Sequence, residues 1–238
     1  MGSHTRHLKR HSMPSSWVSK RKNITFITRP NPGAHKREYS CSILVLLRDL
    51  LGYVKNSREA KYAVKNTEIV INGKRCTDPK QPVGIFDIIE IKETSDIFTL
   101  VFNESGKLKL LETKDNTLIS KISGKRALKN SKFQLNLFNG YNVLITEKEF
   151  KTINVNDSIV YDFGKNKVVK HLPLKEGNFV FVYDGKFKGY FAEVKGFTEY
   201  NGLATDIVQI KIGNEEHNTA KKYCYVIGDK KEDLKRFS

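Results

Sequence analysis

The stretch that decides the fold runs from Asn56 to Cys76 and reads NSREAKYAVKNTEIVINGKRC. Asn56 or Ser57 offers a side-chain oxygen as a helix N-cap, and Glu59 follows Asn56 at the spacing of a capping box. Beyond the helix, residues 67–71 have the composition of a strand, and Asn72-Gly73 is the strongest short signal for a type I′ hairpin turn. The stretch therefore predicts a short helix followed by a β-hairpin whose return strand spans residues 74–77.

Apolar and charged residues fall on opposite faces of this predicted helix. With about 100° of rotation per residue, Ala60, Ala63 and Val64 share one face. The opposite face carries three cations, Arg58, Lys61 and Lys65. Such a face is either simply solvated or a surface that binds phosphates. Lys74 and Arg75, which flank the neighbouring turn, favour the phosphate-binding interpretation.

Flanking residues extend this pattern into a small module. Apolar residues recur at helical spacing from Ile43 to Val54 and predict a first helix that ends near Gly52. After the hairpin, Pro79 and Pro82 break the chain, and residues 86–91 predict a closing strand. This order resembles the S-four RNA-binding domain, with Val70 to Lys74, Pro79 and Asp87 to Ile91 as the matching residues. The resemblance implies that helix and hairpin line an RNA groove formed by Arg58, Lys61, Lys65, Asn72, Lys74 and Arg75.

Composition limits the classes of partner. The 238-residue chain has a formal net charge of +16, which favours a polyanion through counterion release at phosphates. No apolar run approaches the roughly 20 residues needed to span a bilayer, and the N-terminus has no signal-peptide core, so we expect a cytoplasmic protein without a membrane partner. Three widely spaced cysteines indicate a reducing compartment and provide neither a disulfide framework nor a zinc motif. No metal, cofactor or homo-oligomer is expected.

Residues 1–40 are strongly basic, with nine cations and one acid, Glu38. Charge repulsion and prolines predict an extended tail that becomes ordered on nucleic acid; a disordered solubilising tail is the alternative. Trp17 and Phe26 lie among the cations, where they could stack on bases or dock in a crevice. His4, His7 and His11 have a spacing that could hold a metal, but their basic surroundings favour phosphate contact. The predicted RNA-binding residues of the tail are Arg6, Lys9, Arg10, Lys20, Arg21, Lys22, Arg29, Lys36 and Arg37.

The remainder predicts short strands and turns. We expect a central β domain at residues 93–172, with a basic loop that contains Lys121, Lys125, Arg126, Lys129 and Lys132. Gly185, Gly189 and Val194 resemble a KOW motif, although Ala192 stands where a third glycine is usual. The resemblance implies an SH3-like barrel at residues 173–228, with Lys186 and Lys188 in its RNA-binding loop. Residues 229–238 are expected to form a C-terminal tail.

The predicted fold class is α+β: a basic N-terminal tail (1–40), an S-four-like module (41–92), a β-rich central domain and a KOW barrel. The order of the motifs resembles the ribosomal protein S-four-e family of archaeal and eukaryotic small subunits, in its archaeal type. These motifs are His7 to Arg10, Trp17, Arg29-Pro30, Gly33 to Lys36, Val155 to Ile159 and Tyr225 to Gly228. The resemblance implies a structural constituent of the small subunit that supports translation, with small-subunit rRNA and neighbouring ribosomal proteins as partners.

The sequence leaves two other classes of protein to consider. One is a non-ribosomal RNA-binding regulator, such as a transcription-elongation or RNA-chaperone factor built from S-four and KOW units. The other is an enzyme, because some pseudouridine synthases carry an S-four domain. The sequence contains no P-loop, G-x-S-x-G, H-E-x-x-H or paired-cysteine motif. Its only Arg-Asp pair, Arg48-Asp49, lies in the predicted first helix, so we expect no catalytic residues.

Overall fold

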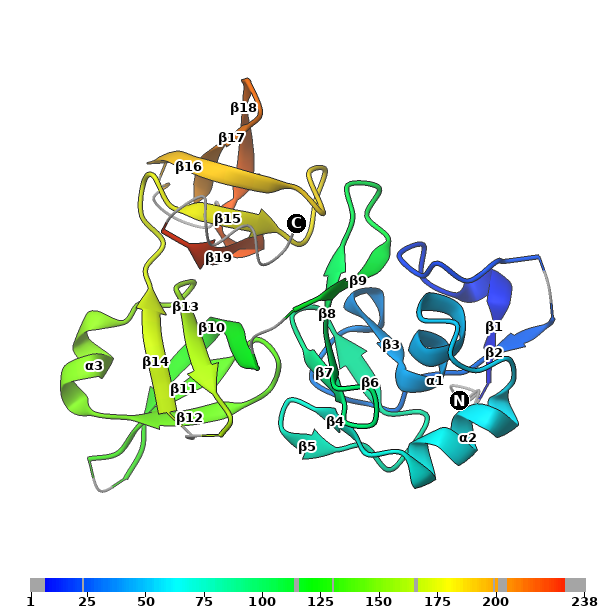
Figure 1. Ribbon diagram of the computed structural model, residues 1–238. Helices are drawn as coiled ribbons and strands as arrows, with labels where there is room; N and C mark the ends of the chain where they lie inside the picture. The colour runs from blue at the N-terminus through cyan, green and yellow to red at the C-terminus, as the bar shows by residue number, and fades with distance from the viewer. Residues whose placement is uncertain are drawn as a thin grey trace, which may run out of the picture. The chain divides into compact units, whose positions relative to one another are not determined.

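The computed structural model of the chain describes residues 7–22, 24–113, 116–129, 131–164, 167–198, 200 and 205–229. The chain divides into two compact units (Figure 1). The first comprises residues 1–101 and 107–115, and the second comprises residues 102–106 and 116–238. Strands outnumber helices among the described elements, so the fold is α+β and rich in β structure. Arg6 and most of the predicted C-terminal tail lie outside the described residues.

The first unit is built on a five-stranded sheet with the order β5-β4-β7-β8-β9. The strands are β4 (Ile69–Ile71), β5 (Lys74–Arg75), β7 (Ile88–Ile91), β8 (Asp96–Phe102) and β9 (Leu108–Glu112). The predicted hairpin turn is confirmed, because Asn72 and Gly73 both have positive φ angles, 48° and 74°, as a type I′ turn requires. A second, two-stranded sheet pairs β3 (Ser40–Ser42) with β6 (Pro82–Gly84).

The domain boundary predicted at residue 92 differs from the structure. Strand β8 pairs antiparallel with β7, from Ile88 opposite Thr99 to Ile91 opposite Asp96. The sheet of the module therefore continues through β8 and β9. Strand β7 is buried along most of its length, and β8 provides its second hydrogen-bonding edge.

The helices follow local signals with one exception. Helix α2 (Ser57–Asn66) begins at Asn56, whose Oδ1 accepts hydrogen bonds from the backbone N–H groups of Arg58 (2.9 Å) and Glu59 (3.0 Å). Its predicted faces are confirmed, since Ala60 and Val64 are buried whereas the three cations are exposed. The predicted first helix is shorter than expected. It consists of α1 (Ile43–Val45) and a π-helical turn, η3 (Leu46–Leu50), and is followed by Gly52 at φ 71°.

The described part of residues 1–40 packs against the module rather than extending away as a tail. Strand β1 (Leu8–Lys9) pairs with β2 (Phe26–Ile27), and short 3₁₀ turns form at η1 (Arg10–Ser12) and η2 (Arg37–Tyr39). Trp17 is 3% exposed and its indole N–H donates to the Ser40 carbonyl at 2.9 Å, so it docks in a crevice. The packing is hydrophobic and involves Leu8, Met13, Trp17, Ile27 and Tyr39. These anchors stabilise the segment against its own charge repulsion.

The second unit contains two five-stranded sheets (Figure 1). The first has the order β12-β11-β10-β13-β14. Its strands are β10 (Thr117–Ala127), β11 (Phe133–Leu137), β12 (Asn142–Ile145), β13 (Ser158–Asp162) and β14 (Lys167–Leu172). Helix α3 (Glu147–Thr152), which was not predicted, begins with a capping box between Thr146 and Glu149. The basic stretch predicted as a loop is largely strand β10, which includes Lys121, Lys125 and Arg126.

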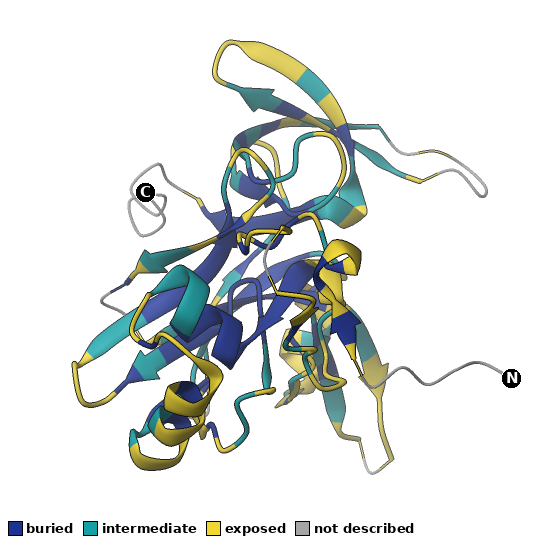
Figure 2. Ribbon diagram, turned by 90° about the vertical axis from the view of Figure 1, so that its right-hand side faces the viewer, coloured by how far each residue is buried: buried dark blue, intermediate teal, exposed yellow. Residues whose placement is uncertain are grey.

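The second sheet of this unit has the order β18-β17-β16-β15-β19. Its strands are β15 (Phe179–Val182), β16 (Phe191–Thr198), β17 (Ile207–Ile212), β18 (Glu215–Ala220) and β19 (Cys224–Gly228), with the 3₁₀ turn η4 (Lys221–Tyr223) before β19. In the loop between β15 and β16, Gly189 has φ 92°, and a Cβ there would lie 1.9 Å from the Asn103 carbonyl oxygen. Only glycine fits this position. Buried residues run along the strands (Figure 2, dark blue).

Lys121 joins the two sheets of the second unit from a buried position. The side chain is 4% exposed, and its ammonium donates to the carbonyls of Lys222 (2.7 Å) and Cys224 (2.8 Å). Nearby, the Tyr225 hydroxyl donates to the Ile119 carbonyl at 2.6 Å. Burial lowers the pKa of Lys121 from 10.5 to about 8. The ammonium of Lys121 thus forms hydrogen bonds with two carbonyl groups, although burial disfavours its charged form.

This pKa predicts a pH dependence that Lys121→Met removes. Between about pH 8 and pH 10.5 the unfolded chain holds a proton on Lys121 that the folded chain has released, so folding stability rises with pH in this range. Relative to Lys121→Met, the wild-type free energy of unfolding is expected to grow by on the order of 3 kcal/mol across this window. Urea unfolding followed by far-UV circular dichroism at several pH values measures the difference. Parallel pH profiles for the two proteins would contradict a buried, charged Lys121.

Candidate nucleic-acid interface

The exposed cations of α2 lie beside those of the hairpin. One Nη of Arg75 in β5 donates to the Lys65 carbonyl at the end of α2, at 3.3 Å. Arg58, Lys61, Lys65, Lys74 and Arg75 are all exposed. Within the described residues, the side chains of Arg58, Lys61 and Lys65 form no ion pair. The Arg75–Lys65 bond places β5 beside the end of α2, and we call the exposed cations of these two elements the helix–hairpin surface.

Two predicted contact residues have internal roles instead. Asn72 is 5% exposed; its amide donates to Asp87 Oδ1 at 2.7 Å and accepts from the Ile88 N–H at 2.9 Å. Arg10 is also 5% exposed, and its guanidinium donates to the Lys20 carbonyl at 2.7 Å. The Asn72 amide is fully engaged inside the module, so we exclude Asn72 from the proposed RNA surface. Arg10 has one internal bond, its buried Nε has no hydrogen-bond partner among the described residues, and its side chain lines a hollow of the first unit.

The other predicted residues are distributed over both units. In the first unit, the exposed ones are Lys9, Lys20, Arg21, Lys22, Arg29, Lys36 and Arg37. Arg21 is partly engaged, since it donates to the carbonyls of His11 (2.8 Å) and Met13 (3.2 Å). In the second unit, Lys186 is exposed, whereas Lys188 is half-buried with its ammonium 3.7 Å from the centre of the Phe102 ring. Lys188 is therefore committed to a cation–π contact.

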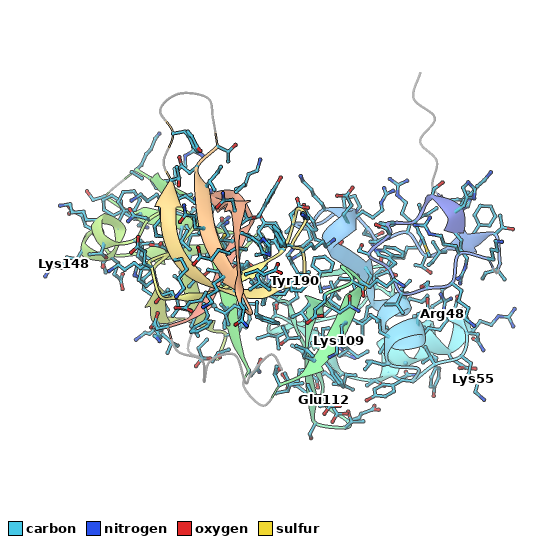
Figure 3. The ribbon with its side chains drawn as sticks, turned by 90° about the horizontal axis from the view of Figure 1, so that it is seen from above. Arg48, Lys55, Lys109, Glu112, Lys148 and Tyr190 are labelled. Carbon is cyan, nitrogen blue, oxygen red and sulfur yellow. The ribbon has the colours of Figure 1, made fainter. Side chains whose placement is uncertain are left out.

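A groove of about 370 Å³ lies between β1, β2, α1 and the start of α2. Four cations line it, namely Arg29, Arg48, Lys61 and Lys80. A second hollow of about 540 Å³ shares Arg48 and adds Lys20 and Lys55; Figure 3 labels Arg48 and Lys55. Sequence reasoning missed Arg48 and Lys80, because neither belongs to a motif and Arg48 stands in an apolar run. Only the folding of residues 7–29 against the module brings them to one site.

Arg48 is positioned by its neighbour. Its Nε and one Nη donate to Asp49 at 2.7 and 2.9 Å, a bidentate pair, and Ser19 also donates to Asp49. Burial tends to raise the pKa of Asp49, but the hydrogen bonds from Arg48 and Ser19 hold it below its ordinary value. Asp49 thus stays ionised and offsets part of the charge of Arg48 in the second hollow.

Asp87 connects the N-terminal segment to the hairpin. It is 3% exposed and accepts from the Gly84 N–H (2.6 Å), from Asn72 (2.7 Å) and from His35 Nε2 (3.2 Å to Oδ2). Burial tends to lower the pKa of His35, but the charge and hydrogen bond of Asp87 raise it above its ordinary value. Gly84 leaves room for this contact, because a Cβ there would lie 2.1 Å from the His35 ring. The cluster holds the basic segment against the sheet.

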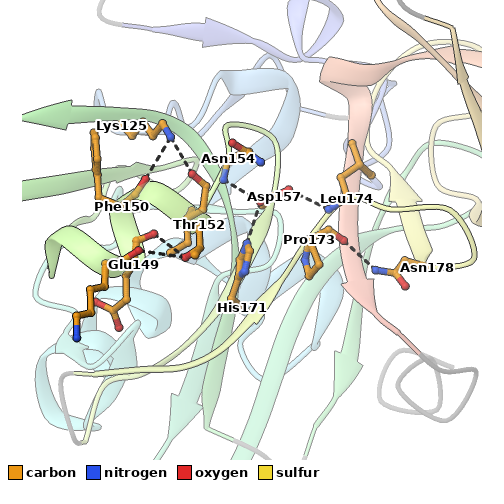
Figure 4. A network of polar contacts seen from close by, with 12 residues as sticks. Lys125, Glu149, Phe150, Thr152, Asn154, Asp157, His171, Pro173, Leu174 and Asn178 are labelled. Carbon is orange, nitrogen blue, oxygen red and sulfur yellow. Dashed lines mark hydrogen bonds and ion pairs between the residues drawn. The ribbon is translucent and has the colours of Figure 1, made fainter.

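Asp157 has a comparable role in the second unit (Figure 4). Asp157 is 4% exposed, and its carboxylate accepts from the N–H groups of Asn154 and Leu174, both at 2.9 Å, and from His171 Nε2 at 2.8 Å. These bonds tie the loop after α3 to strand β14 and to the connection that leads into β15. This cluster is structural, because its carboxylate is occupied by internal donors.

Features of other site types are absent from the described part of the chain. No three His, Cys, Asp or Glu side chains among these residues gather as metal ligands would. The three cysteines are buried thiols, and burial raises the pKa of Cys41 to about 12 and those of Cys76 and Cys224 to about 11. No described helix is long and apolar enough to cross a membrane.

A β-rich α+β chain with cations gathered over a helix, a hairpin and a groove has the features of an RNA-binding protein. Residues 94–168 match the family described as "Ribosomal family S4e", and residues 1–38 match the RS4NT domain. Curated archaeal relatives named "Small ribosomal subunit protein eS4" include one from Methanococcus aeolicus, 34% identical over 95% of this chain and 95% of the relative. Another, from Methanocaldococcus jannaschii, is 31% identical over 97% of both. The chain therefore belongs to the ribosomal protein S4e family, and the predicted archaeal-type resemblance is confirmed.

A solved structure supports the fold. The 30S ribosomal protein S4e from Thermoplasma acidophilum superimposes with a TM-score of 0.68 and covers 81% of this chain and 97% of its own. At 22% sequence identity, this similarity is evidence for the fold alone.

Proposed function

We propose that the chain is a structural constituent of the small ribosomal subunit that binds small-subunit rRNA and neighbouring ribosomal proteins in the cytoplasm. The observation that supports the proposal is the helix–hairpin surface, where two adjoining elements carry five exposed cations in a chain of this family. Its mechanism is neutralisation of rRNA phosphates by these cations, with an affinity that falls as salt rises. The family is structural and non-enzymatic, and its members' names do not favour the alternative of a non-ribosomal regulator.

The β15–β19 sheet is proposed as the KOW-like barrel of this protein. Its strand frame, with the glycine loop between β15 and β16, supports this assignment. In that loop Lys186 is the better candidate for RNA contact, because Lys188 packs on Phe102.

Replacing Arg58, Lys61, Lys65 and Arg75 together by alanine is expected to weaken binding to small-subunit rRNA by a hundred- to a thousandfold, at about 1 kcal/mol per lost contact. The slope of affinity against salt concentration is also expected to decrease, because fewer counterions are released. Filter binding over a salt series measures both quantities, and circular dichroism checks that the variant folds.

A matched control removes the same charge from the second unit. Lys132, Lys148, Lys167 and Lys175 are exposed, and their joint replacement by alanine also subtracts four charges. If both variants lose affinity equally, net charge rather than the helix–hairpin surface carries binding. If neither loses affinity, the proposed surface is wrong.

A further inference from the structure

The groove beside the helix–hairpin surface has an apolar component that phosphate binding leaves unexplained. Ile24 and Phe26 line it and are 59% and 49% exposed. Leu8, Ile27 and Leu44 also line it and are buried, so they provide an apolar floor. Single exposed apolar residues are ordinary, but here an aromatic and an aliphatic side chain share one concave site with four cations.

Phe26 is held in place while half of its surface stays accessible. Its strand β2 pairs with β1, with Lys9 opposite Phe26 and Leu8 opposite Ile27. The His7 ring lies 5.3 Å from the Phe26 ring, tilted by 47°. A tilted neighbour at this distance supports the ring but does not cover its face as a parallel stack would. Phe26 is thus a preformed aromatic surface at the mouth of the groove.

The positive charge of the groove favours an anionic ligand. Among the described residues that line it, none carries a carboxylate, and Arg29, Lys61 and Lys80 are exposed cations. The fourth cation, Arg48, is paired with Asp49, which does not line the groove. Ser57 and Thr28 add hydroxyl groups. A volume of about 370 Å³ falls within the range of small-molecule pockets, roughly 300–1,000 Å³, and is too small to admit a double helix.

We propose that this groove receives a single unpaired RNA nucleotide, with its base against Phe26 and Ile24 and its phosphate among Arg29, Lys61 and Lys80. The inference rests on the proposed function and deepens it by naming the chemical class that this site takes. Unstacked bases in loops and bulges are the usual targets of aromatic side chains in RNA recognition. A paired helix would meet the helix–hairpin surface, whereas an extruded base would enter the groove.

Chemical probing of small-subunit rRNA bound to the full chain tests the proposal. Base-reactive probes report unpaired nucleotides, and hydroxyl radicals report the backbone footprint. The wild type is expected to protect at least one unpaired nucleotide that Phe26→Ala leaves reactive and Phe26→Tyr still protects. Tyr62→Ala is the matched control, since Tyr62 is 72% exposed on α2 and does not line the groove.

Affinity provides a second readout. Phe26→Ala is expected to raise the Kd for the rRNA by roughly 5- to 150-fold, the range for losing one base stack on an aromatic ring. The salt slope is expected to stay at the wild-type value, because no charge is removed. An unchanged Kd and an unchanged protection pattern in Phe26→Ala would overturn the inference while leaving the proposed function intact. Absence of any backbone footprint with the wild type would instead overturn the proposed function.

A photo-crosslink shows whether the ligand in the groove is RNA or protein. Purified subunits that carry Phe26→p-benzoylphenylalanine are expected to crosslink to rRNA on irradiation. Crosslinking only to a neighbouring protein would show that the groove holds a peptide, and would overturn the assignment to a nucleotide.

Discussion

Asp87→Ala is expected to lower the free energy of unfolding of the first unit by about 3–5 kcal/mol, the range for removing one partner of a buried ion pair. The substitution leaves three donors without their acceptor: the Gly84 N–H, the Asn72 amide and His35. Asp87 and His35 have side chains only 4% exposed, so water does not replace the lost bonds at no cost. The N-terminal segment is expected to loosen from the module as a consequence.

Trp17 allows the decrease in the free energy of unfolding to be measured for the first unit alone. It is the only tryptophan of the chain and is buried in the N-terminal segment of the first unit. Urea unfolding followed by tryptophan fluorescence therefore reports the first unit. Glu93→Ala is the control, because Glu93 is an exposed carboxylate close to the same sheet. Equal midpoints for the two variants would mean that Asp87 does not hold the segment in place.

Asp157→Ala is expected to destabilise the second unit by a comparable amount, about 3 kcal/mol, because it leaves two backbone N–H groups and His171 without their buried acceptor. The loop after α3 and the connection that leads into β15 both lose their anchor. Amide hydrogen exchange is expected to accelerate most in peptides that cover residues 153–174.

The control for Asp157 is Glu147→Ala in α3. Glu147 forms an exposed i,i+4 pair with Lys151, at 2.7 Å, and exposed pairs contribute roughly 0.3–0.5 kcal/mol. Faster exchange spread equally over both units, or an equal effect of the two substitutions, would contradict an anchoring role for Asp157.

Local signals determined the centre of the first unit. An N-cap at Asn56 or Ser57, the opposed faces of α2 and the Asn72-Gly73 turn were all predicted, because each depends on residues within a few positions of one another. The structure places the cap at Asn56. The cations of α2 and β5 were predicted for the same reason, since helical periodicity and the hairpin turn place them outward. The order of the motifs along the chain is enough to indicate the family.

Tertiary packing decided which side chains are buried and where the groove forms, because local sequence signals do not encode either feature. Charge alone predicted an extended tail, but the buried Leu8, Met13 and Trp17 dock the segment on the module. Arg10 and Asn72 have the chemistry of RNA ligands, yet both face partners distant in sequence, such as the Lys20 carbonyl and Asp87. The groove is likewise assembled from separate segments, so Arg48 and Lys80 carried no signal. By itself the sequence determined the family, the helix, the hairpin and their cations; only folding decided which cations are buried and where the groove lies, because burial depends on neighbours far along the chain.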